Sequence, residues 1–125
     1  MNQTLHLLGL SLALTACAQA APIINEVLSS NRTIFADEDG DFGDWVEIYN
    51  PDAAAYKLDG HFLTDSANDF EKWEFPDVEI PAKGYLVVFA SGKDRRDKDK
   101  ALHTSFGISA SGEFVGLIDP DAETV

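Results

Sequence analysis

After residue 20, the apolar stretches of this chain are short, and turn-forming residues separate them. They are rich in β-branched and aromatic side chains, which favours strands over a helix of normal length. Turn signals such as Asn50-Pro51 and Asp119-Pro120 recur about every ten residues. This pattern is typical of an all-β antiparallel sandwich. We expect strands at 22–28, 45–49, 61–64, 72–75, 78–80, 85–90 and 113–118.

The aromatic side chains of these strands alternate with small or polar residues, which predicts that they form the sandwich core. They are Trp45, Trp73, Phe75, Tyr85, Phe89 and Phe114. The segment 85–90 is apolar at every position, so we expect a central strand that is covered on both faces.

The first twenty residues contain no Asp, Glu, Lys or Arg. Leu5 to Ala18 is an apolar stretch that is too short to span a bilayer as a helix. It has the length of a signal-peptide core, and Ala18-Gln19-Ala20 supplies a small–x–small cleavage pattern. We therefore predict a signal peptide over 1–20, cleavage after Ala20 and one domain over 21–125.

Cys17 leaves a second way of processing open. Leu14-Thr15-Ala16-Cys17 resembles the bacterial lipobox at 14–17, in which the cysteine carries the lipid and begins the mature chain. A lipid anchor would hold the protein at a membrane without a transmembrane helix. Under either processing, we expect an extracytoplasmic domain, secreted or at the cell surface.

The net charge narrows the class of partner. The chain has 22 acidic and 9 basic residues, a formal net charge of −13. Nucleic-acid binding needs a basic surface that displaces counterions, and anionic membranes attract Lys and Arg clusters, so neither is expected as a partner. A single cysteine excludes an internal disulfide framework.

The order of motifs resembles a known family. The blocks IINEVLSSN, DEDGDFGDWVEIYNP, LDGHFLTD, KWEFP, IPAKGYLVVFASGKD and LHTSFGISASGEFVGLIDPD follow one another from Pro22 to Asp121. They resemble the bacterial branch of the lamin tail domain family, and WVEIYNP and GYLVVFASGKD are the most specific blocks. The resemblance implies an immunoglobulin-like β-sandwich in a secreted or surface protein. The family usually continues into a further closing strand, so we expect a sheet that lacks its last strand.

The resemblance also implies the function. We expect a non-catalytic binding or attachment module that recognises a protein or envelope polymer through loops and sheet edges. The alternative is the N-terminal accessory domain of a larger secreted hydrolase or spore-coat-kinase-like protein, because bacterial members often carry such modules. A reading frame that continues beyond Val125 would favour the alternative.

Residues 37–44 hold five acidic side chains and two glycines. Carboxylate oxygens in a loose loop suit a hard cation such as Ca²⁺, which would also screen their repulsion. The spacing does not match the helix–loop–helix calcium motif. The competing interpretation is a solvated acidic loop that needs no cofactor. Under the calcium hypothesis the candidate ligands are Asp37, Asp39, Asp41 and Asp44.

Two other parts of the sequence carry groups that could take part in chemistry. Residues 93–100 hold five of the nine basic residues between three aspartates, which favours an exposed loop with local charge pairs over a docking site for an acidic ligand. His61 and His103 are the histidines of the predicted domain, and no nucleophile elbow, phosphate-binding loop or His-x-x-x-His pair accompanies them. We expect His61 to pack in the core and His103 to lie on a loop, and we predict no catalytic residues.

Overall fold

The computed structural model describes residues 19–123 and 125. Cys17 and the 14–17 motif lie outside these residues, as does nearly all of the predicted signal peptide. The described chain forms nine strands and no helix. The strands are β1 (Ile23–Leu28), β2 (Asp44–Tyr49), β3 (Tyr56–Lys57), β4 (Phe62–Thr64), β5 (Trp73–Glu74), β6 (Glu79–Ile80), β7 (Tyr85–Ala90), β8 (Leu102–His103) and β9 (Gly116–Ile118).

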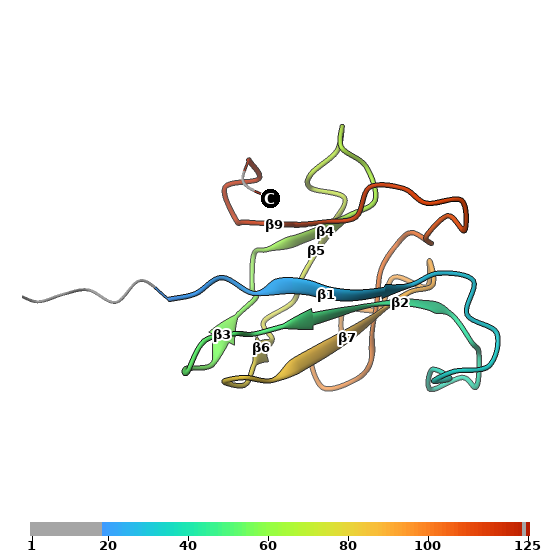
Figure 1. The fold of residues 1–125 in the computed structure, drawn as a ribbon, viewed down its shortest axis with the longest axis horizontal. Helices are drawn as coiled ribbons and strands as arrows, with labels where there is room; N and C mark the ends of the chain where they lie inside the picture. Colours follow the sequence, from blue (N-terminus) through green and yellow to red (C-terminus); the bar gives the residue numbers. More distant parts are fainter. Residues whose placement is uncertain (1–18, 124) are drawn as a thin grey trace, which may run out of the picture.

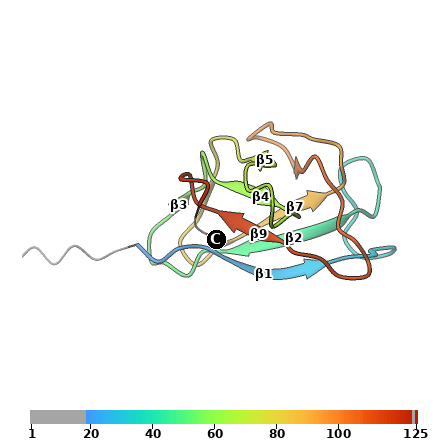
Figure 2. The ribbon, with the colours of Figure 1, turned by 90° about the horizontal axis from the view of Figure 1, so that it is seen from above.

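The strands form two main layers and one small sheet. One layer has the order β1-β2-β7-β8, the second has the order β5-β4-β9, and β3 pairs with β6. Figure 1 shows β4 and β9 on one side of the long strands β1, β2 and β7. The view from above in Figure 2 shows β4 and β9 lying over β7 and β2. The all-β immunoglobulin-like sandwich predicted from the sequence is confirmed.

The core lies between the two layers. Val46 and Ile48 alternate along β2 and are fully buried, and Val88 pairs with Val46 across the sheet. Leu63 of β4 and Trp73 of β5 face them from the second layer, and both are also fully buried. The alternation of β2 thus points every second side chain into the sandwich, as the period of a strand requires.

The structure corrects several local predictions. β8 was not predicted, and it runs parallel to β7, so the sheet is not purely antiparallel. β9 begins at Gly116, three residues after the predicted start. Tyr85 and Phe114 are 57% and 38% exposed, so their predicted places in the core are wrong. Tyr85 stands on the outer face of β7, and Phe114 precedes β9 and stacks on Phe70.

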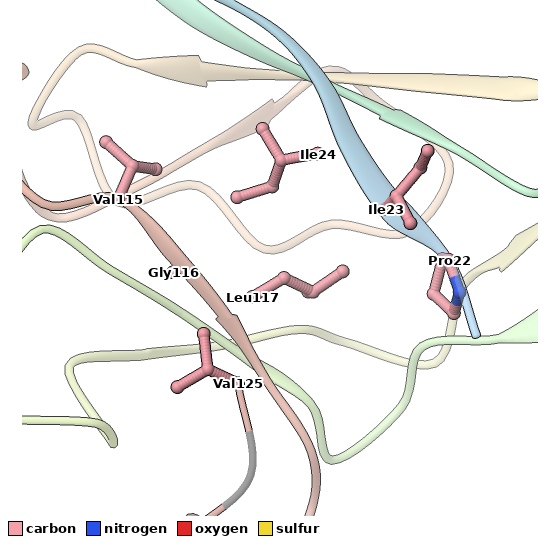
Figure 3. A pocket seen from close by; sticks show the side chains of 7 residues that line it. All are labelled: Pro22, Ile23, Ile24, Val115, Gly116, Leu117 and Val125. Atoms are coloured by element: carbon pink, nitrogen blue, oxygen red, sulfur yellow. The ribbon is translucent and has the colours of Figure 1, made fainter.

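An apolar groove separates the edge strands of the two layers. Among the described residues, β1 has β2 as its one strand neighbour and β9 has β4. The groove has a cavity of about 230 Å³, and Figure 3 shows the side chains of Ile24 and Leu117 lying between the two strands. Pro22, Val115 and Val125 also line it. Two unpaired strand edges therefore flank one apolar cavity.

Candidate functional site

The acidic loop, residues 37–41, is closed by its own backbone. The Asp37 carboxylate accepts hydrogen bonds from the N–H groups of Asp39 and Asp41 at 2.9 and 3.0 Å. The Asp37 N–H donates to the Asp41 carbonyl at 2.8 Å, and Gly40 takes a φ of +81° in the turn. Aspartate is suited to such turns because its side chain can replace a backbone acceptor, and glycine allows the positive φ.

Two basic residues from the segment that follows β7 close over this loop. Lys93 Nζ lies 2.6, 2.8 and 2.9 Å from carboxylate oxygens of Asp37, Asp39 and Asp41. Arg95 reaches Glu38 at 2.6 Å and Asp39 at 2.8 Å. The Asp37 side chain has no solvent exposure, so the Lys93 ammonium neutralises a buried carboxylate. We call residues 37–41 together with Lys93 and Arg95 the charged clamp.

Buried contacts hold the clamp in place. His103 on β8 is fully buried, not on a loop as predicted. Its Nδ1 lies 2.7 Å from the Ser91 Oγ, and its Nε2 lies 2.8 Å from a Glu38 carboxylate oxygen. The hydrogen bond with His103, together with that from Arg95, holds the pKa of Glu38 below its usual value. The backbones of Arg95 and His103 exchange two hydrogen bonds, at 2.9 and 3.0 Å.

These contacts lower the pKa values of Asp37 and Asp39. Burial raises the pKa of Asp37, but hydrogen bonds from Lys93 and from the N–H groups of Asp41 and Asp39 outweigh it, so the pKa lies below its ordinary value. Hydrogen bonds from Arg95 and then Lys93 lower the pKa of Asp39 to about 2. The clamp therefore favours ionised carboxylates.

Stability is expected to depend on pH through Asp39. A carboxylate whose pKa is lowered by folding stabilises the fold above the unfolded pKa of about 3.9 and loses that effect as the pH falls through the folded pKa. We expect the difference in melting temperature between the parent and Asp39→Asn to shrink from pH 5 to pH 2. Asp59→Asn, at an exposed residue, should show no such trend. A constant difference for Asp39→Asn would contradict the assignment.

The structure brings together three of the four predicted calcium ligands. Ligand oxygens of Asp37, Asp39 and Asp41 lie within 4.8 Å of one another. Asp44 does not join them, because it begins β2 and its carboxylate accepts a hydrogen bond from the Asn31 N–H at 3.0 Å. The Lys93 ammonium stands at the point where the three carboxylates converge. Calcium binding stays a prediction, with Asp44 placed apart from the other ligands.

Sequence reasoning did not find Lys93 and Arg95 as partners of the acidic loop. It predicted that the charges of 93–100 pair locally, which holds for Arg96 with Asp94 and for Lys100 with Asp97. The excess of basic residues in 93–100 was a signal that this segment could pair with 37–44. Residues 37–44 are the acidic segment, and 93–100 hold most of the basic residues of the chain. His61 is buried, as predicted, with its ring edge-on to Tyr56.

Comparisons with known proteins give one result. No curated protein and no solved structure matches the chain. Among the described residues, no helix has the length and apolar character needed to cross a membrane. The lamin tail domain matches residues 15–125, which is nearly the whole chain, and the nine strands fit its immunoglobulin-like sandwich. The chain belongs to the lamin tail domain family.

Proposed function

We propose that this domain is a non-catalytic, extracytoplasmic binding or attachment module. The observation that carries the proposal is the apolar groove between β1 and β9. Unpaired strand edges offer backbone donors and acceptors to another chain, and an apolar cavity beside them offers a place for side chains. Sheet edges and loops are then the means of recognition.

The absence of catalysis is part of the proposal. Among the described residues, Ser91, His103 and Glu38 form the contact that most resembles a catalytic relay. The His103 side chain is fully buried, and none of the three residues lines the β1–β9 cavity. A relay needs a substrate beside its nucleophile, so we assign these residues to holding the charged clamp.

Cell fractionation tests both the location and the groove. In intact cells of its own host, we expect the protein to be accessible to added protease and to remain with the envelope fraction. Val125→Glu places a charge at the groove and is expected to release the protein into the medium. Ile34→Glu is the matched control, because Ile34 and Val125 are 61% and 66% exposed and Ile34 lies away from the groove.

Two results would overturn the proposal. Protection from protease in intact cells would exclude a location at the cell surface, and protection that persists after the envelope is permeabilised without lysing the cytoplasm would exclude an extracytoplasmic location. Equal release of Val125→Glu, Ile34→Glu and the parent would show that the groove does not contribute to attachment. Cleavage after Ala20 and lipid attachment at Cys17 remain alternative predictions for how the protein reaches the envelope, and incorporation of labelled fatty acid that is lost in Cys17→Ser would identify the second.

A further inference from the structure

The outer face of the β1-β2-β7 layer is covered at one end and open at the other. Side chains alternate along β2, so Trp45, Glu47 and Tyr49 point away from the core that holds Val46 and Ile48. At the covered end, Phe35 stacks on Phe89 with ring centroids 5.6 Å apart. The other end carries an aromatic pair and a carboxylate pair.

The aromatic pair joins β2 and β7. Tyr49 lies directly opposite Tyr85, and their ring centroids are 4.8 Å apart with an interplanar angle of 30°. Tyr85 is 57% exposed, so much of its ring is open to solvent. Aromatic faces carry negative potential and attract ammonium and guanidinium groups.

The carboxylate pair joins β1 and β2. Glu26 lies opposite Glu47 in the strand register, and Glu47 is two residues from Tyr49 along β2. Like charges placed directly opposite each other destabilise a sheet. No Lys or Arg of residues 19–123 forms an ion pair with either glutamate, and Glu47 accepts a hydrogen bond from Asn25 Nδ2 at 2.8 Å. The charged clamp differs, because its carboxylates have basic partners within the chain.

We infer that this face binds an extended basic segment of a partner polypeptide. Its rows of tyrosines and glutamates are two residues apart along β2, a separation of about 7 Å. Alternate side chains of an extended peptide have the same separation, so a basic side chain can reach the glutamates while its neighbour two residues away covers the tyrosines. The net charge of −13 attracts such a segment from a distance. The inference names a partner chemistry for a surface other than the β1–β9 groove and does not depend on that groove.

Isothermal titration of the purified protein with a nine-residue peptide of alternating arginine and serine tests the inference, in about 0.15 M salt with a chelator. We expect Tyr85→Leu and Glu47→Gln each to weaken binding by about threefold to tenfold. Tyr85→Phe keeps the aromatic face and should stay within about twofold of the parent. Glu74→Gln is the matched control, since it removes the same charge from an exposed residue of β5. Circular dichroism melts verify that each variant is folded.

Three outcomes would overturn the inference. Equal weakening by Glu47→Gln and Glu74→Gln would show attraction by net charge alone. Unchanged affinity in Tyr85→Leu would show that the aromatic pair does not contribute to peptide binding. Tyr85-dependent binding of a neutral oligosaccharide, without binding of the peptide, would make the face a glycan platform. Val125→Glu, which tests the groove, should bind the peptide as the parent does, so the inference and the attachment proposal fail independently.

Discussion

Replacing Asn50 with aspartate is expected to lower the free energy of unfolding by at least about 3 kcal/mol at neutral pH. Asn50 follows β2 and is fully buried. Its Nδ2 donates to the carbonyls of Ala54, Ile80 and Pro81 at 2.9, 3.1 and 3.1 Å. An ionised carboxylate at this buried position has no proton to donate and would face three carbonyl oxygens. In the parent, the Asn50 side chain holds the turn after β2 against the turn before β7.

Urea denaturation at two pH values measures this effect. Burial among acceptors disfavours the charged form, so the deficit of Asn50→Asp should be smaller at pH 4 than at pH 7, because the protonated acid regains one donor. Asn68→Asp makes the same chemical change at an exposed position and should shift the midpoint little. A midpoint for Asn50→Asp equal to that of the parent would show that the three hydrogen bonds contribute nothing.

Replacing Lys93 with methionine is expected to give the second large loss of stability. The change keeps the length of the apolar stem and removes the ammonium from three carboxylates, one of them with a fully buried side chain. An unpaired buried charge costs more than an exposed one. The melting temperature should fall further than in Lys98→Met, where the side chain is exposed and makes no ion pair among the described residues. Equal falls would contradict a role for the clamp.

The same variant sharpens the calcium prediction. In the parent, calcium has to compete with the Lys93 ammonium, whereas Lys93→Met leaves three carboxylate oxygens within 4.8 Å without it. Millimolar Ca²⁺ is expected to raise the melting temperature of Lys93→Met by more than that of the parent. Adding Asp39→Asn and Asp41→Asn should abolish both responses. If neither melting temperature responds to Ca²⁺, this loop does not bind calcium.

Much of the fold could be predicted from local patterns. The alternation of Val46 and Ile48 with Glu47 fixes the buried face of β2, and turn residues mark where strands end. The pattern could not show how many layers cover an apolar strand, so Tyr85 was placed in the core although its side chain is 57% exposed in the described structure. The two-residue strands β3 and β8 were missed because their partners, not their own sequence, define them.

The site was predictable only in part for a related reason. The acidic loop is local in sequence, and its three converging aspartates could be proposed from their spacing. Its basic partners lie more than fifty residues further along. They arrive there because Asp44 pairs with Ala90, which sets the start of β2 beside the end of β7. The clamp is thus a consequence of strand register, which one sequence does not reveal.

The pairing of β9 with β4 bears on when the domain can fold. β4 meets a strand about fifty residues further along, and β9 lies close to the end of the matched region. Pairings between distant segments form slowly, because the chain entropy lost in closing a long loop precedes the contacts that compensate for it. The second layer therefore cannot close on a growing chain until β9 has been synthesised. Under the proposed extracytoplasmic role, this delay would keep the polypeptide in the loose state that a translocation channel accepts.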